Sequence, residues 1–100
     1  MNKERREEER KVVSWDARWE GLSGWNNARV TDISLGGCFV ETFDHAAVGD
    51  IISFEIRLPS GEWLPLRGEV TFYQPQIGFS LCFSFLTDEE QRLLTPLINY

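Results

Sequence analysis

Residues that commonly bind metal ions or form disulfides are scarce in this sequence, which has two cysteines and one histidine among 100 residues. Structural metal sites usually take several such ligands at close spacing, and no Cys-x-x-Cys pair is present, so we expect no metal site. Cys38 and Cys82 lie in apolar runs and are interpreted as small buried thiols of a reducing compartment. The sequence alone leaves a disulfide between them open.

Apolar runs long enough to cross a membrane are also absent. A spanning helix needs roughly 18 or more consecutive apolar residues. Residues 1–11 are charged almost throughout and do not resemble the apolar part of a secretory signal. We therefore expect a cytoplasmic protein without membrane insertion, and a length of 100 residues predicts one domain with a modest core.

Positive charge is in short supply beyond the N-terminal segment. The chain has a formal net charge of −6, of which residues 1–11 contribute +1, so the remaining residues carry −7. A nucleic-acid polymer is bound through an extended basic face, which an acidic body does not offer. A small ligand with one or two phosphates needs only a few local arginines, so the charge pattern favours a small anionic ligand over DNA or RNA.

Groups suited to catalysis are few as well. His45 is the only histidine, and the sequence places no nucleophile beside it. Asp32 could act as a general acid or base in principle, but no second carboxylate is marked as its partner. We therefore predict no catalytic residues, no cofactor and no enzyme activity.

What the sequence does contain is strand patterning. Residues 13–20 alternate strictly between apolar and polar side chains, and residues 52–58 repeat this pattern. The remaining strands are expected over residues 28–33, 38–42, 63–73 and 77–85. The intervening segments are interpreted as loops over residues 21–27 and 43–50 and a hairpin turn over 59–62.

The C-terminal end changes to helical spacing. Thr87 and Glu90 form the pattern of a capping box at the start of a helix. An apolar stripe at helical spacing follows, made of Leu93, Leu94, Leu97 and Ile98. Pro96 should limit the regular helix to about two turns or kink it. The fold class predicted is mainly all-β, a six-stranded antiparallel β-barrel with a short C-terminal α-helix packed on it.

A compact polar turn separates the second and third predicted strands. It runs from Asp32 through Ser34 to Gly36 and Gly37. Asp and Ser side chains at such a place commonly bond their own backbone, and glycine tolerates backbone conformations that other residues avoid. A purely structural turn is therefore one interpretation. The other is a binding site in which the carboxylate and the hydroxyl face a ligand.

An arginine cluster, Arg5, Arg6 and Arg10, precedes the first predicted strand. One interpretation is a solvated tail of mixed charge. The other is a flexible arm over residues 1–11 joined to a barrel domain over residues 12–100. Because Arg10 lies close to the first strand, such an arm could fold over a ligand that rests on the barrel.

These two features, in this order, resemble the PilZ family of bacterial receptors for cyclic diguanylate (c-di-GMP). Arg6 and Arg10 are spaced as in the family's first motif, and Asp32-x-Ser34-x-x-Gly37 is similar to its second. Similar segments also stand at residues 12–19, 48–50, 58–61, 77–79 and 87–99, so the resemblance covers nearly the whole chain.

The resemblance implies a single-domain c-di-GMP receptor that signals to a protein effector in motility or biofilm regulation. The arginines would pair with phosphates and stack on guanine, as planar guanidinium groups can. Asp32 and Ser34 would bond the guanine edge, and Gly36 and Gly37 would let the backbone approach the ligand.

Two further points bear on this implied site. Arg5 stands where some family members carry an additional arginine associated with a stacked pair of ligand molecules, so a ligand dimer is expected. Glu7, Glu8 and Glu9 depart from the family's pattern, because their carboxylates would compete with phosphates for the arginines. The alternative function is a PilZ-like adaptor that binds no nucleotide and acts only through protein–protein interaction.

The four tryptophans divide into two groups. Trp25 lies between a glycine and two asparagines and is expected to be an exposed contact residue. The other three lie on predicted strands and are expected to pack in or on the barrel: Trp15, Trp19 and Trp63.

Overall fold

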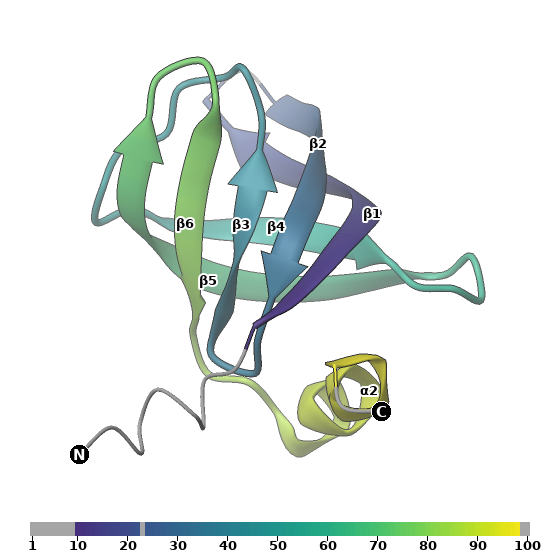
Figure 1. Cartoon of the computed structure of the whole chain (residues 1–100). Helices are drawn as coiled ribbons and strands as arrows, with labels where there is room; N and C mark the ends of the chain where they lie inside the picture. Colours follow the sequence, from purple (N-terminus) through teal and green to yellow (C-terminus); the bar gives the residue numbers. More distant parts are fainter. Residues whose placement is uncertain (1–9, 23, 99–100) are drawn as a thin grey trace.

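The computed structural model describes residues 10–22 and 24–98, and its course is shown in Figure 1. In chain order the strands are β1 (Lys11–Gly21), β2 (Gly24–Ile33), β3 (Gly37–Glu41), β4 (Ile51–Arg57), β5 (Trp63–Gln74) and β6 (Gly78–Phe83). The helix α2 (Asp88–Ile98) follows the last strand.

The six strands form one closed barrel in the order β1-β2-β3-β6-β5-β4. Every neighbouring pair is antiparallel. β1 closes the barrel by pairing with β4, where Ala17 lies opposite Ile56 and Trp19 lies opposite Phe54. A six-stranded antiparallel barrel followed by a C-terminal helix confirms the predicted fold class.

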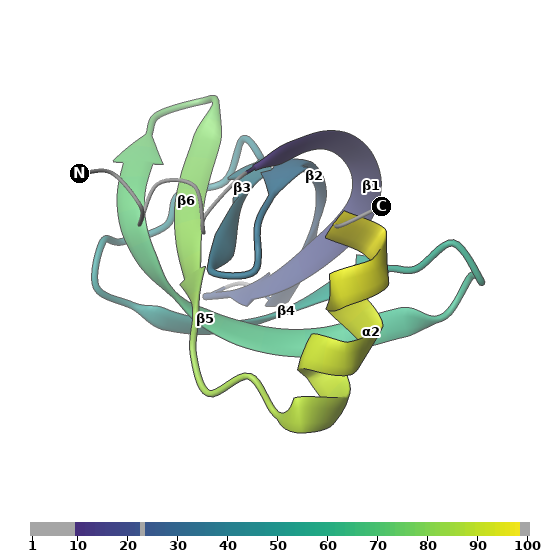
Figure 2. The same ribbon diagram turned by 60° about the horizontal axis from the view of Figure 1, so that its bottom comes forward.

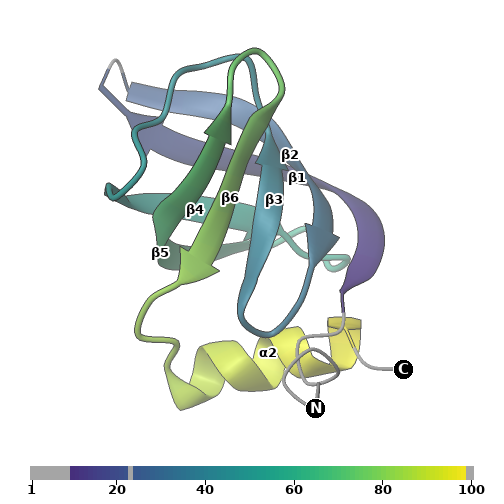
Figure 3. The ribbon, with the colours of Figure 1, turned by 60° about the vertical axis from the view of Figure 1, so that its left-hand side comes forward.

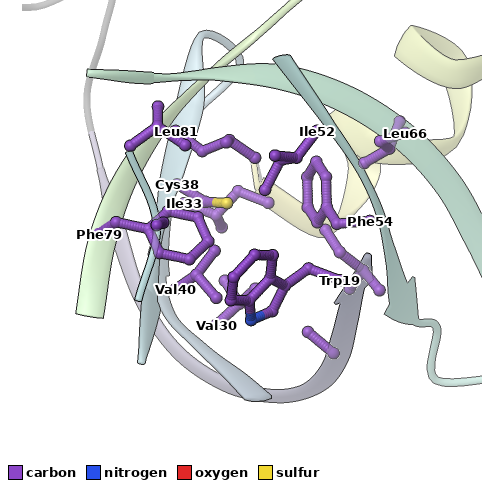
Figure 4. Packing of buried hydrophobic residues seen from close by; sticks show 14 of the residues in the cluster. Trp19, Val30, Ile33, Cys38, Val40, Ile52, Phe54, Leu66, Phe79 and Leu81 are labelled. Carbon is purple, nitrogen blue, oxygen red and sulfur yellow. The ribbon is translucent and has the colours of Figure 1, made fainter. Parts of the chain in front are cut away.

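Aliphatic side chains and three aromatic rings, Trp19, Phe54 and Phe79, fill the interior of the barrel, as Figure 4 shows. The ring of Trp19 meets that of Phe79 edge to face, with 5.1 Å between centroids. Its indole Nε1 donates to Thr42 Oγ1 at 3.4 Å, so the polar atom of this buried ring has a partner. Alternation along each strand puts one side chain in two inside, which is why period-two patterning predicts the core.

The helix α2 lies across one end of the barrel, next to the start of β1 and the turn between β2 and β3 (Figures 2 and 3). Leu94 is fully buried against the core. The predicted capping box is confirmed, because Glu90 N donates to Thr87 Oγ1 at 3.1 Å and Thr87 N donates to Glu90 Oε1 at 3.0 Å.

The C-terminal end of α2 is held by the first strand. Lys11 Nζ donates to the backbone carbonyl of Leu97 at 3.2 Å. The last turn of α2 contains no basic residue of its own, so Lys11 supplies the positive charge that a helix C-terminus favours.

The hairpin between β1 and β2 is longer than the sequence predicted. β2 begins at Gly24, so residues 24–27, expected in a loop, lie in a strand. Glu20 pairs with Trp25, and Gly21 pairs with Gly24, whose positive φ of 111° suits glycine. Strand pairing with β1 overrides the loop preference of the asparagines here.

Two predictions at the C-terminal end were also wrong. The strand expected over residues 77–85 ends at Phe83, and Phe85 is exposed with a φ of 51°. α2 runs over 11 residues and continues past Pro96 to Ile98, so the expected limit of about two turns is wrong; a proline in the final turn removes only one late backbone bond. No helix among the described residues is long and apolar enough to span a bilayer.

The two cysteines lie on opposite faces of the barrel wall. Cys38 is buried, as expected, whereas Cys82 is exposed, which corrects the prediction for that residue. Cys38 pairs with Leu81, so alternation turns the side chain of the next residue, Cys82, to the outside. Both thiols are free.

Candidate functional site

The first residue that the structure describes contacts the carboxylate of the polar turn. Arg10 Nη1 lies 2.5 Å from Asp32 Oδ1, and both side chains are partly exposed, at 47% and 33%. The pairing of β1 with β2 brings them together, because Lys11 lies opposite Ile33 and Val12 opposite Asp32. Two residues that are 22 positions apart in the sequence therefore meet at one end of the barrel.

A bulge in β2 turns Asp32 toward solvent. Val30 pairs with Val40 and Asp32 pairs with Phe39, so Thr31 is an extra residue on its strand. In a regular strand Asp32 would share the inward face of Val30. Here Val30 and Ile33 are both fully buried, and the carboxylate between them lies in the barrel surface.

The side chain of Ser34 forms hydrogen bonds with the backbone of its own turn. The residue is fully buried, and its Oγ accepts a bond from Gly36 N at 3.2 Å and lies 3.4 Å from Gly37 O. Its backbone N donates to Gly37 O at 2.8 Å. The hydroxyl thus satisfies backbone groups of its own turn, which makes Ser34 a positioning residue for Asp32 in this structure.

Gly36 and Gly37 dock the same turn onto β6. Phe83 N donates to Gly36 O at 2.9 Å. A Cβ atom on Gly37 would stand 2.1 Å from Leu81 O, closer than any side chain can be accommodated without moving backbone. Close packing against β6 therefore explains why a glycine stands at position 37, which the sequence did not indicate.

The thiol behind the site is inert. Burial raises the pKa of Cys38 above its ordinary range; the negative charge of Asp32 raises it further, and Arg10 acts in the opposite direction. Cys38 lies opposite Ile33 and belongs to the hydrophobic core. It therefore stays a protonated core residue.

The remaining arginines of the predicted site, Arg5 and Arg6, lie outside the described residues, as do Glu7, Glu8 and Glu9. Of the seven predicted ligand-binding residues, the structure thus brings together Arg10, Asp32 and the turn from Ser34 to Gly37. Sequence reasoning missed the bond from Lys11 to α2, because nothing local to residue 11 indicates a partner 86 positions away.

Comparison with protein families gives one match over nearly the full chain. A family model described as "PilZ domain" matches residues 4–100. No curated protein matches the chain.

Solved structures share the fold. The inhibitor of motility of Bacillus subtilis (MotI/DgrA) is 22% identical with a TM-score of 0.73, over 92% of this chain and 48% of that one. The PilZ domain of CeSA from a cellulose-synthesizing bacterium is 17% identical with a TM-score of 0.68, over 90% of this chain and 94% of that one. The chain thus spans about half the length of the motility inhibitor.

Proposed function

This chain belongs to the PilZ domain family, and we propose that it is a c-di-GMP receptor whose ligand binds between the N-terminal arginine arm and the turn that begins at Asp32. The single observation that supports this best is the contact between Arg10 and Asp32. It joins the two motifs of the proposed site at one end of the barrel.

The Arg10–Asp32 pair suits a site that exchanges partners. Both side chains are partly exposed, and an ion pair of that kind contributes only about 0–1 kcal/mol, so separating it costs little. A dinucleotide offers phosphates to the guanidinium of Arg10 and guanine N–H donors to the carboxylate of Asp32. Each group would thereby replace one partner with another of matching charge or hydrogen-bonding type.

In this proposal the turn that begins at Asp32 and the N-terminal arm make different contacts with the ligand. The hydrogen bond of Ser34 and the close packing of Gly37 would fix the backbone of the turn, so that only the side chain of Asp32 changes partner on binding. Arg5 and Arg6 would add phosphate contacts and guanine stacking from the arm, with Arg5 favouring a stacked ligand dimer. The output would pass to a protein effector, in motility or biofilm regulation as is typical of the family.

Titration calorimetry with c-di-GMP tests the proposal. We expect binding by the wild-type chain and a loss of roughly 1–3 kcal/mol for Arg10→Ala and for Asp32→Ala, as removal of a charged contact gives. Cyclic diadenylate should bind much more weakly, because adenine lacks the guanine donor edge that a carboxylate accepts from. The measured stoichiometry tests the expectation of a ligand dimer.

Arg92→Ala is a suitable control, because Arg92 is an exposed residue of α2 that pairs with Glu89. Its c-di-GMP affinity should equal that of the wild type. Absence of binding by the folded wild-type chain at high micromolar ligand would favour the adaptor function without nucleotide.

A further inference from the structure

Two tryptophans and two arginines gather on the outer wall of the barrel, and we call them the tryptophan–arginine patch: Arg18, Trp25, Arg57 and Trp63. The guanidinium carbon of Arg18 lies 4.1 Å from the ring centre of Trp63 and 5.9 Å from that of Trp25. The guanidinium of Arg57 lies over Trp63 at 5.5 Å. Each arginine thus rests on an aromatic face.

Strand register builds the patch from four adjacent strands, β2, β1, β4 and β5. Arg18 stands between the buried residues Ala17 and Trp19, so alternation directs it outward. Arg57 pairs with Trp63 at the base of the β4–β5 hairpin, which projects from the barrel in Figure 1. The patch therefore belongs to the outer wall and not to the barrel end that α2 covers.

The patch is preorganised. Two guanidinium nitrogens of Arg18 contact one oxygen of Glu55 at 2.7 Å, which fixes the side chain between the two indole rings. Trp25 nevertheless keeps 49% of its surface exposed. Rigid, partly exposed Trp and Arg side chains are the types that dominate the binding energy of protein interfaces.

The charges bordering the patch indicate the chemistry of its partner. Among the described residues, no carboxylate lies within ion-pair distance of Arg57, whose Nε donates only to Gly61 O at 3.2 Å. Arg57 and Arg29 line one hollow together with Asp16, which lies 3.6 Å from Arg29. The hollow therefore keeps an excess of positive charge, whereas Glu55 and Glu20 stand beside Arg18 and Trp25 in the other half of the patch.

From these observations we propose that the tryptophan–arginine patch is a docking surface for an acidic segment of a partner protein. Carboxylates of that segment pair with Arg57 and Arg29, and its apolar side chains lie on the exposed ring of Trp25. A closed barrel leaves no strand edge for the partner to extend, so recognition takes place through side chains.

This surface is separate from the proposed nucleotide site. Arg18 is eight residues beyond Arg10 along β1, roughly 26 Å of extended strand. Arg29, in contrast, is three residues before Asp32 on β2. Peptide binding is therefore measured without c-di-GMP, so that failure of this proposal can be distinguished from failure of the nucleotide site.

Selection from a random peptide library displayed on phage, with the whole chain as target, tests the proposal. We expect the selected peptides to be rich in Asp and Glu together with apolar residues. As synthetic peptides, they should bind Arg57→Ala and Trp25→Ala at least about tenfold more weakly than the wild type, the scale of an interface hot spot. Arg92→Ala should bind them unchanged, since that arginine lies on α2.

Nuclear magnetic resonance of the indole N–H groups locates the contact. The signals of Trp25 and Trp63 should move on addition of a selected peptide, whereas that of buried Trp19 should stay in place. Excess c-di-GMP should not displace the peptide. A selection that yields no binders, peptides without acidic enrichment, or peptides that lose affinity with Arg10→Ala instead of Arg57→Ala would overturn the proposal.

Discussion

Arg67 on β5 donates to Glu90 Oε1 of α2 at 2.8 Å, and the same oxygen accepts the backbone N–H of Thr87. One carboxylate oxygen thus serves both the cap of the helix and its attachment to the barrel. The side chain of Glu90 is only 15% exposed, so these bonds are partly shielded from water.

Glu90→Ala should lower the free energy of unfolding by about 1–3 kcal/mol, because it removes the capping carboxylate and leaves Arg67 bonded only to the carbonyl of Phe85. Urea denaturation measures the change. Glu89→Ala is the matched control on the same helical turn: its pair with Arg92 is exposed, and the loss should stay below about 1 kcal/mol. Equal effects of the two substitutions would contradict the prediction.

Ser34→Ala should destabilise the fold by about 1–2 kcal/mol, since it removes a fully buried hydroxyl that accepts the partly buried N–H of Gly36. The effect is measured by the same denaturation. Ser53→Ala, at an exposed position of β4, should change stability by no more than about 0.5 kcal/mol. A Ser34→Ala variant as stable as the wild type would show that the turn does not need the hydroxyl.

Arg10→Ala should have almost no effect on stability, at most about 1 kcal/mol, because the pair with Asp32 is partly exposed. Thermal unfolding without ligand provides the measurement. This result is needed beside the titration of c-di-GMP, since it separates a lost ligand contact from a damaged fold. A large drop in unfolding temperature would instead assign the pair a structural role.

Alkylation with iodoacetamide near neutral pH should modify one thiol of the folded chain and two in concentrated urea. Cys82 is exposed and free, whereas Cys38 is buried and its pKa is raised, so its thiol stays protonated. Mass spectrometry of the digested protein identifies the modified residue. Cys82→Ser should abolish labelling of the folded chain, and labelling of Cys38 without urea would contradict this account.

Much of the barrel could be predicted from the sequence, because apolar residues at every second position indicate which side chains of a strand face inward. This pattern predicted the strand at residues 52–58 well, and β4 spans Ile51–Arg57. The same pattern does not predict a bulge. In β2 the bulge adds Thr31 as an extra residue, and this is why Asp32 is exposed. The pattern also cannot report tertiary pairing, which extends β2 back to Gly24 through residues with weak strand preference.

The sequence predicted which residues make up the candidate site, but not which of them face a ligand and which only support the turn. The order of the arginines and the Asp-x-Ser turn indicated that the two motifs would meet, and Arg10 does contact Asp32. The burial of Ser34 and the backbone contact of Gly37 with Leu81 depend on β6, more than 40 residues further along the chain. No local pattern carries that information.

The register of the closed barrel also has a consequence for the order of folding. Arg10 and Asp32 lie on one hairpin, 22 positions apart, whereas closure joins Ala17 to Ile56, 39 positions away, and β3 pairs with β6 over a similar separation. Loop-closure entropy makes such distant pairings slow to form. We therefore expect the contact between the two motifs to arise within an early local hairpin, and the two distant pairings, β1 with β4 and β3 with β6, to set the overall folding rate.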